Sequence, residues 1–255
     1  MRPGDRGEGD LHGRTVLVTG GGSGIGAACA RELARHGAAV RVADIDGVAA
    51  KTVATEVGGT AWEVDLSDVA ALENLELDVD ILVNNAGVQT VAPITEFPPE
   101  RFRTMLALMV EAPFLLTRAA LPHMQRQRFG RIVNVSSVHG LRASAFKSAY
   151  VTAKHALEGL SKVTALEGGP FGITSNCVDP GYVRTPLVDK QIADQAKAHG
   201  IAEQEVVETV MLTESAIKRL VEPEEVASLV GWLTSDMAGM VTGASYTMDG
   251  GWSAR

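Results

Sequence analysis

Tyr150 and Lys154 are four residues apart, a spacing that puts both side chains on one face of a helix. Ser137 follows the apolar run 131–136, which is typical of a buried strand. A phenol, a nearby ammonium and a hydroxyl at a strand end are the groups needed to interconvert an alcohol and a carbonyl. The ammonium favours the phenolate, so we expect Lys154 to pull the pKa of Tyr150 below its usual value of about 10. Taken alone, the same spacing is also that of an ordinary helix face.

A glycine-rich turn near the N-terminus indicates a second site, one for a dinucleotide. The apolar strand 14–19 runs into Gly20-Gly-Gly-Ser-Gly-Ile-Gly26, and an Ala-rich helix follows. Glycines let the backbone approach a pyrophosphate closely, and the N-terminus of the helix offers free N–H groups. A glycine turn by itself is weak evidence, but the strand before it and the helix after it make the prediction strong.

Asp44 directly follows the next expected strand, 39–43, at the place where an acid binds a ribose 2′-hydroxyl. A carboxylate there would repel a 2′-phosphate, and no basic residue directly follows it. We therefore expect NAD rather than NADP as the cofactor. The alternative is that Asp44 is only a polar residue at a strand end.

The elements that must position these groups alternate between strands and helices. Further strands are expected at 60–64, 79–83, 131–136, 173–178 and 244–248, and long helices at 100–127 and 148–167. This alternation predicts an α/β fold, a Rossmann-like doubly wound parallel sheet with helices on both faces.

The chain divides into a tail and one domain. Residues 1–10 are polar and Gly-rich, and we expect them to be a mobile tail; residues 11–255 form a single dinucleotide-binding and catalytic domain. The segment from about 182 to 220 is rich in Ala, Gln, Glu and Lys and predicts two helices, 187–198 and 202–213. Insertions after the strand ends of such sheets flank the ligand, so we expect a helical lid over the substrate. An ordinary pair of surface helices is the alternative.

The composition of the chain excludes several classes of binding partner. The formal charge of −8 argues against a nucleic-acid partner. We find no apolar run that would cross a bilayer and no signal peptide, so we expect no membrane partner. The two cysteines, Cys29 and Cys177, are too few for a disulfide framework and suggest a reducing, cytoplasmic compartment. We expect no metal site.

Together these motifs resemble the short-chain dehydrogenase/reductase family, from about Leu11 to Arg255. The spacing from Thr19 to Gly26 matches the family's Thr-Gly-x-x-x-Gly-x-Gly turn, and Asn84-Asn-Ala-Gly87 matches a second motif. Ser137 and the Tyr-x-x-x-Lys of Tyr150 and Lys154 match its catalytic set. Pro180-Gly181 matches the turn over the nicotinamide.

The resemblance implies a general acid/base role for Tyr150, an orienting role for Ser137, and a Lys154 that lowers the pKa of Tyr150 and binds the nicotinamide ribose. It implies a homotetramer by analogy. It also implies that the cofactor contacts Gly20, Ser23, Gly24, Ile25, Gly26, Asp44, Asp65, Leu66, Asn85, Ala86, Gly87, Tyr150, Lys154, Pro180, Gly181, Val183 and Thr185.

Within the family, the substrate positions resemble those of D-3-hydroxybutyrate dehydrogenases. The match includes Ala-Phe-Lys-Ser-Ala-Tyr at 145–150 and the final Asp-Gly-Gly-Trp-Ser-Ala-Arg. In those enzymes the residues at the positions of Gln89, His139, Lys147 and Gln191 hold the substrate carboxylate, beside Ser137 and Tyr150. An acidic chain must supply a local cation for an anionic substrate, and Lys147 provides one. Tyr182 and Trp252 are candidates for bounding the methyl end of the substrate. Each of these residues could also be an ordinary surface or loop side chain.

The sequence departs from the family pattern at two places. Met109 stands where many members have an asparagine that helps hold a water next to the active-site lysine, and methionine cannot donate a hydrogen bond. Pro113 lacks the N–H that would bond the Met109 carbonyl, so we expect a kinked helix with that carbonyl free for water. The segment 65–80 is short, which leaves room only for a reduced helix. Met109 keeps open a nucleotide-binding regulator with little turnover, and a reductase of another small 3-oxo acid or alcohol is the nearest alternative among enzymes.

Overall fold

A computed structural model describes residues 11–186, 188–189, 192–193, 196 and 200–254. The expected mobile tail at 1–10 lies outside the described residues, as do Gln191 and much of the first expected lid helix.

Seven parallel strands form one sheet in the order β3-β2-β1-β4-β5-β6-β7. The strand order reverses between β1 and β4, and in such sheets ligands bind outside the strand carboxyl ends at the reversal. The strands are β1 Thr15–Thr19, β2 Ala39–Asp44, β3 Thr60–Glu63, β4 Ile81–Asn84, β5 Gly130–Val135, β6 Ile173–Pro180 and β7 Ser245–Met248. All seven expected strands are present, with ends shifted by no more than two residues.

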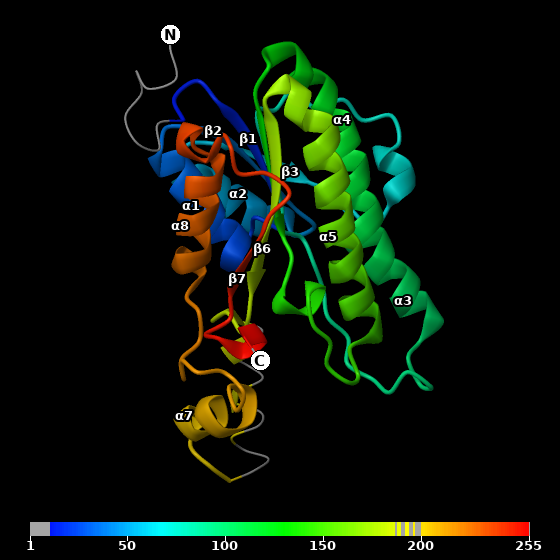
Figure 1. Ribbon diagram of the computed structural model, residues 1–255, viewed down its shortest axis with the longest axis vertical. Coiled ribbons are helices and arrows are strands. Elements are labelled where there is room, and N and C mark those ends of the chain that lie inside the picture. Colours follow the sequence, from blue (N-terminus) through cyan, green and yellow to red (C-terminus); the bar gives the residue numbers. More distant parts are fainter. Residues whose placement is uncertain (1–10, 187, 190–191, 194–195, 197–199, 255) are drawn as a thin grey trace.

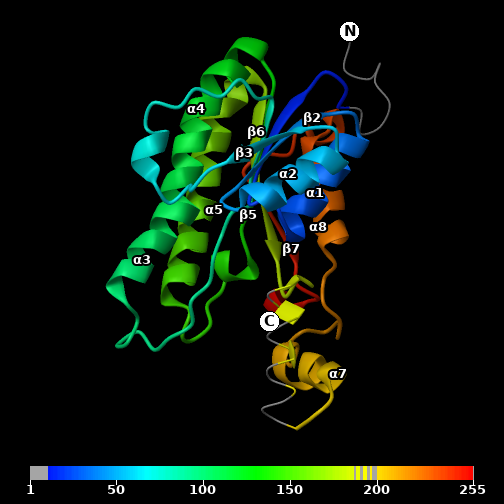
Figure 2. The same cartoon turned by 180° about the vertical axis from the view of Figure 1, so that it is seen from behind.

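Helices cover both faces of the sheet (Figures 1 and 2). The first face carries α1 Gly24–Arg35, α2 Gly47–Glu56 and α8 Pro223–Thr234, and the second carries α3 Pro99–Leu106, α4 Ala112–Gln127 and α5 Ser148–Gly168. This is the Rossmann-like architecture that the sequence predicts.

Alternate residues of each strand supply two hydrophobic cores. Val16 and Val18 of β1 pack in the core under α1 and α8, whereas Leu17 packs with Leu116 of α4 on the opposite face. Because both faces of the sheet are covered, the central strands β4 and β5 are buried at every position, including the polar Asn84 and Asn134 and the charged Arg131. The sheet is therefore a rigid platform for the loops at its carboxyl edge.

The helix expected at 100–127 is interrupted. It widens to π spacing at Ala107–Glu111, where the N–H of Ala112 bonds the carbonyl of Ala107. Instead of a simple kink at Pro113, the structure has a widened turn that ends two residues before this proline. Without an N–H at residue 113 the regular ladder cannot continue through this turn, and an extra residue is accommodated instead.

By length and apolar composition alone, Pro99–Gln127 would also pass for a membrane span, which corrects our expectation that no such run exists. Its apolar window is 44% buried inside the molecule, where it packs on the sheet. A core helix of a globular domain has the same composition.

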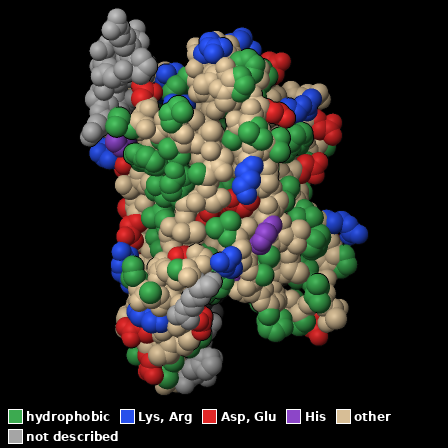
Figure 3. Space-filling view, viewed as in Figure 1, with side chains coloured by type: hydrophobic (Ala, Val, Ile, Leu, Met, Phe, Trp, Pro, Cys, Tyr) green, Lys and Arg blue, Asp and Glu red, His purple; other side chains and the backbone are tan. Residues whose placement is uncertain are grey.

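The structure also describes the two regions in which the sequence predicts less regular structure, residues 65–80 and much of 182–220. Between Asp65 and Asp80 only a short 3-10 turn, Val69–Leu72, remains, as the reduced helix predicts. The second of the two helices expected between 182 and 220 is present as α7 Glu203–Val206, continued by a π turn, Val207–Met211. Figure 3 shows the lobe that carries α7 standing apart from the α3–α5 side, with a notch between them.

Candidate active site

The glycine turn joins β1 to α1 in a conformation that only glycine adopts easily. Gly20 has φ +60° and Gly24 has φ +50°. A Cβ on Gly26 would collide with the Gly20 carbonyl, which explains glycine at that position. Ser23 precedes α1 in an extended conformation and makes no side-chain cap, so the first turn of the helix is open for an anion. The turn therefore fits a dinucleotide pyrophosphate.

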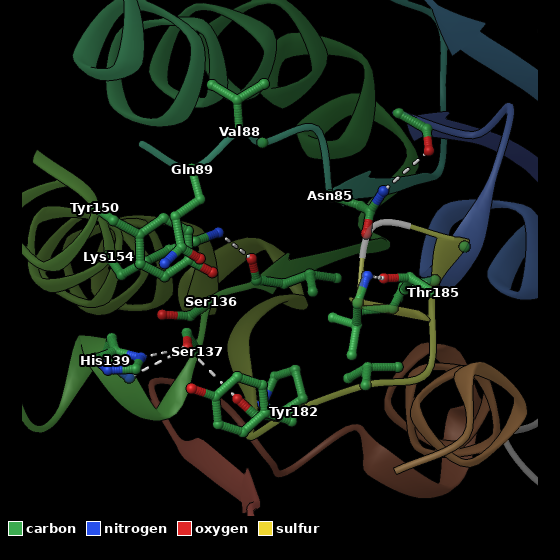
Figure 4. Close-up of a pocket in the computed structure, with 18 of the residues that line it drawn as sticks. Asn85, Val88, Gln89, Ser136, Ser137, His139, Tyr150, Lys154, Tyr182 and Thr185 are labelled. Atoms are coloured by element: carbon green, nitrogen blue, oxygen red, sulfur yellow. Dashed lines mark hydrogen bonds between the residues drawn. The ribbon is translucent and has the colours of Figure 1, made fainter. Parts of the chain in front are cut away.

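Asn85 braces this turn from the neighbouring strand end. Its side-chain amide donates to the carbonyls of Thr19 at 2.9 Å and Gly20 at 3.1 Å, and its N–H donates to the Thr19 hydroxyl at 2.9 Å. The amide group expected to contact the cofactor is thus already used to hold two turns together, and Figure 4 shows Asn85 in this position. Asn85 fixes the spacing of the turns on which a dinucleotide would lie.

Asp44 lies at the carboxyl end of β2, beside the glycine turn. One carboxylate oxygen accepts the N–H of Gly22 at 2.8 Å, and the other accepts the N–H of Asp46 at 3.0 Å. Because these bonds hold the side chain in place, its negative charge has a fixed position on the wall of the cavity described next.

A single cavity of about 1360 Å³ runs along the carboxyl edge of the sheet. Its volume exceeds the 300–1,000 Å³ typical of a small-ligand pocket, so it has room for a dinucleotide and a small substrate together. Of the described residues that the sequence analysis assigns to cofactor or substrate contacts, all line this cavity except Gly26, which lies beneath the glycine turn. The wall includes Gly20, Ser23, Gly24, Ile25, Asp44, Asp65, Leu66, Asn85, Ala86, Gly87, Gln89, Ser137, His139, Lys147, Tyr150, Lys154, Pro180, Gly181, Tyr182, Val183, Thr185 and Trp252.

Ser137, Tyr150 and Lys154 meet in this cavity (Figure 4). Ser137 comes just after β5, where its hydroxyl accepts the N–H of His139 at 3.2 Å, and the other two lie one turn apart at the start of α5. The Lys154 ammonium donates to the carbonyl of Val135 at 2.7 Å and lies 5.5 Å from the centre of the Tyr150 ring. A phenol, a hydroxyl and an ammonium therefore share one wall.

The electrostatics of this set differ from expectation in one respect. Burial raises the pKa of Tyr150, and the Ser137 hydroxyl opposes this only in part, so the expected downward shift is wrong for the structure as described. Burial also lowers the pKa of Lys154 to about 8, against the opposing effect of Cys177 and nearby carboxyl groups. The depth of both side chains is a property of packing that the spacing of Tyr150 and Lys154 does not reveal.

His139 is held as a neutral ring. Burial and the charge of Lys147 lower its pKa to about 4, so one ring nitrogen donates and the other accepts at neutral pH. Nε2 lies 2.9 Å from the hydroxyl of Ser144, and Nδ1 lies 3.4 Å from that of Ser137. Ser144 was missed in the sequence, because nothing in a loop serine reveals that it orients a histidine.

Lys147 stands immediately before α5, with its ammonium 5.5 Å from the centre of the Tyr182 ring. Burial lowers its pKa. Within the described parts of the chain, the ammonium has no carboxylate or hydrogen-bond partner. The preceding Phe146 adopts a left-handed φ of +67°, and its carbonyl accepts the N–H of Ala92 at 3.0 Å, which fixes where Lys147 begins. The cavity therefore has an unpaired cation on its wall.

The remaining substrate positions are only partly described. Gln89 lies on the wall in the loop after β4, and Figure 4 shows it above Tyr150 and Lys154. Trp252 lies 5.8 Å from His139, ring centre to ring centre. Arg101 and Thr104 also line the cavity, although the sequence offers no sign that this face of α3 does so. Gln191 lies outside the described residues.

Comparison with known proteins gives a consistent result. A family model described as enoyl-(acyl carrier protein) reductase matches residues 20–253. D-beta-hydroxybutyrate dehydrogenase of Rhizobium meliloti (strain 1021) is 43% identical, with 95% of this chain and 99% of the relative covered. The enzyme of the same description from Cupriavidus necator is 43% identical, with 96% and 100% covered.

A solved structure is also similar over nearly the whole chain. A putative NAD(P)-dependent gluconate 5-dehydrogenase from Beutenbergia cavernae, with bound NADP, has a TM-score of 0.86 and 34% identity. The alignment covers 98% of this chain and 100% of that one.

Proposed function

This chain belongs to the short-chain dehydrogenase/reductase family, and from that premise we propose that it is an NAD-dependent D-3-hydroxybutyrate dehydrogenase. Family membership makes it an oxidoreductase that uses a nicotinamide cofactor. The proposal adds the substrate, the preference for NAD and the roles of individual residues.

The unpaired ammonium of Lys147 is the observation that supports this substrate most directly. It lies on the same cavity wall as Tyr150 and Ser137, and the neutral ring of His139 and the amide of Gln89 add hydrogen-bonding groups beside it. A half-buried cation without a partner favours an anionic ligand. A cation at one end and acid/base groups at the other would select a short hydroxy acid.

The proposed roles follow from the positions of the side chains. Ser137 orients the reacting oxygen of the substrate, and Tyr150 takes its proton in oxidation and returns it in reduction. The Lys154 ammonium stabilises the phenolate form of Tyr150. A nicotinamide cofactor bound along the glycine turn would supply the hydride-transfer chemistry at carbon 3 of the substrate. Oxidation thus removes one hydride and one proton and leaves acetoacetate.

NAD is proposed over NADP because of Asp44. Its fixed carboxylate lies where the ribose 2′-oxygen would come, and two negative groups in contact are unfavourable. The residues just after it, Ile45 and Asp46, provide no cation for a phosphate.

We further propose that residues 11–255 act as one catalytic domain with a lid at about 182–220. Val210, Met211 and Thr213, which follow α7, line the cavity and so would lie near a bound substrate. Homotetramer formation is proposed by analogy with the family. A cytoplasmic site of action is proposed from the two free, buried cysteines.

A panel of short substrates tests the proposal. NAD reduction is measured with 3-hydroxybutyrate, other small hydroxy acids and simple secondary alcohols of similar size. We expect 3-hydroxybutyrate to give the highest kcat/KM. A neutral alcohol as the best substrate would favour another reductase, and NAD binding without turnover on any of them would favour a nucleotide-binding regulator.

A further inference from the structure

Two carboxyl side chains that the reaction does not use are buried behind the proposed catalytic residues. Glu158 lies on α5 one turn beyond Lys154, and Asp179 lies near the end of β6. They are 4% and 0% exposed. Charged groups are rarely buried to this degree unless they are paired with a cation or have neutralised each other.

Three of the four oxygens of this carboxyl pair lack a hydrogen-bond donor among the described residues. Ser245 donates to one oxygen of Glu158 at 2.6 Å. The other Glu158 oxygen and both Asp179 oxygens have no hydrogen-bond partner in the described part of the molecule, and neither does the hydroxyl of Ser136. A Cβ on Gly140 would lie 3.0 Å from Glu158 Oε1, so glycine at that position leaves room for the carboxyl group. A proton held on one carboxyl group would donate to an oxygen of the other, so a single proton would supply one hydrogen bond between the two groups.

The ionisation of the carboxyl pair agrees with this geometry. Burial and the adjoining Glu158 carboxyl raise the pKa of Asp179. Burial also disfavours ionised Glu158, but the neighbouring Asp179 carboxyl group and the nearby hydroxyl groups of Ser245 and Ser136 outweigh it and lower its pKa. Two carboxylates in contact cannot both ionise easily, so one keeps its proton.

The carboxyl pair also acts on the active-site lysine. The Lys154 side chain is only 4% exposed, and this burial disfavours its charged form. The acidic groups that favour the charged form are the thiol of Cys177, Asp179 and Glu158. The other groups found next to the Lys154 ammonium are the phenol ring of Tyr150 and the Val135 carbonyl, and neither carries a negative charge at neutral pH. No other counter-charge for the ammonium is present among the residues described.

We propose that Glu158 and Asp179 hold one proton between them, and that the single negative charge left on the carboxyl pair keeps Lys154 protonated beside Tyr150. Both are positioning residues, because they act through Lys154. Their importance for turnover rests on the proposed function, whereas the shared proton and the charge of Lys154 do not.

Amide substitutions distinguish a shared proton from two separate charges. In Glu158→Gln or Asp179→Asn the new amide can donate to the remaining carboxylate, so the net charge stays at −1. In the double variant it falls to zero. We therefore expect each single variant to leave the pKa of Lys154 nearly unchanged, and the double variant to lower it by about one unit or more.

Two measurements follow the pKa of Lys154 and the proton on the carboxyl pair without any assay of activity. The pKa of Lys154 is followed by NMR of protein labelled at the lysine ε-carbon, with Lys154→Arg to identify the resonance. Infrared spectroscopy detects the stretch of a buried protonated carboxyl group, which we expect in the wild type and in neither single variant. Asp80→Asn is the matched control: it removes a buried carboxylate already bonded to Thr15 and Arg14 at the other edge of the sheet, and should alter neither signal.

Additive shifts from the two single variants would mean that both groups are ionised, and would overturn the shared proton. An unchanged Lys154 pKa in the double variant would overturn the counter-charge. If both measurements agree with expectation, a pH profile of kcat/KM for oxidation gives a further check. The pH above which kcat/KM falls should be lower in the double variant, following the lower pKa of Lys154, and unchanged in the two single variants. A wild type that shows both signals but does not oxidise 3-hydroxybutyrate would refute the proposed function and leave the carboxyl pair intact.

Discussion

Removing the charge of Lys147 should weaken recognition of the substrate carboxylate without disturbing the cofactor. The ammonium is half-buried, its pKa is already lowered by burial, and no described residue neutralises it. A charge-assisted hydrogen bond of this kind contributes about 1.5–3 kcal/mol. Since about 1.4 kcal/mol corresponds to a factor of ten, Lys147→Ala should lower kcat/KM for 3-hydroxybutyrate by about 10- to 150-fold, mainly through KM.

The assay is NAD reduction with 3-hydroxybutyrate and, in parallel, with a neutral secondary alcohol of similar size. We expect the alcohol to be a poor substrate of the wild type and to be unaffected by the substitution, and NAD affinity to change little. Lys147→Met repeats the loss of charge while keeping most of the side-chain volume, and Lys162→Met on the exposed side of α5 is the matched control. Equal losses for the acid and the alcohol would mean that Lys147 has a structural role, and the reasoning would be refuted.

Three further predictions concern the cofactor, the lid and the widened helix. Asp44→Ala should relax the preference for NAD over NADP, measured as the ratio of kcat/KM values; wild-type protein that binds both equally would contradict the role of Asp44. Hydrogen exchange in Glu203–Met211 should slow when NAD and substrate bind together, and equal protection with and without them would exclude a lid. Pro113→Ala should lower turnover, because a new N–H there can occupy a carbonyl of the preceding turn that we expect to hold water near Lys154. Full turnover in that variant would count against this relay, as would a structure with no water near the Met109 carbonyl.

The fold was predictable because its signals are local. β1 and β4 are short, largely apolar runs, and the alternation of strands with helices implies parallel pairing. The sequence predicts that the helix is interrupted near Ala107–Glu111, but it does not predict that the interruption is a turn of π spacing. Pro113 shows that the ladder must break, whereas the widened form of the break depends on tertiary packing, here of the buried Met105 and Met109 with residues of α5.

The candidate site was predictable to the extent that family motifs mark it. Tyr150 and Lys154 share a helix, so their spacing places them together, and Ser137 reaches them from a strand end. The upward shift in the pKa of Tyr150 was not predictable, because burial depends on the whole fold. The partnership of Glu158 with Asp179 was invisible for the same reason, since the two residues lie on different elements and meet only through tertiary packing.

The central claim is that Tyr150 moves the proton when this chain oxidises D-3-hydroxybutyrate with NAD. The most direct test measures NADH and acetoacetate formed from D-3-hydroxybutyrate by the wild type and by Tyr150→Phe. We predict equal amounts of the two products from the wild type, and a rate at least about 100-fold lower in the variant, because general acid/base catalysis contributes that much or more. A wild type that forms no acetoacetate, or a variant that keeps the wild-type rate, would contradict the claim.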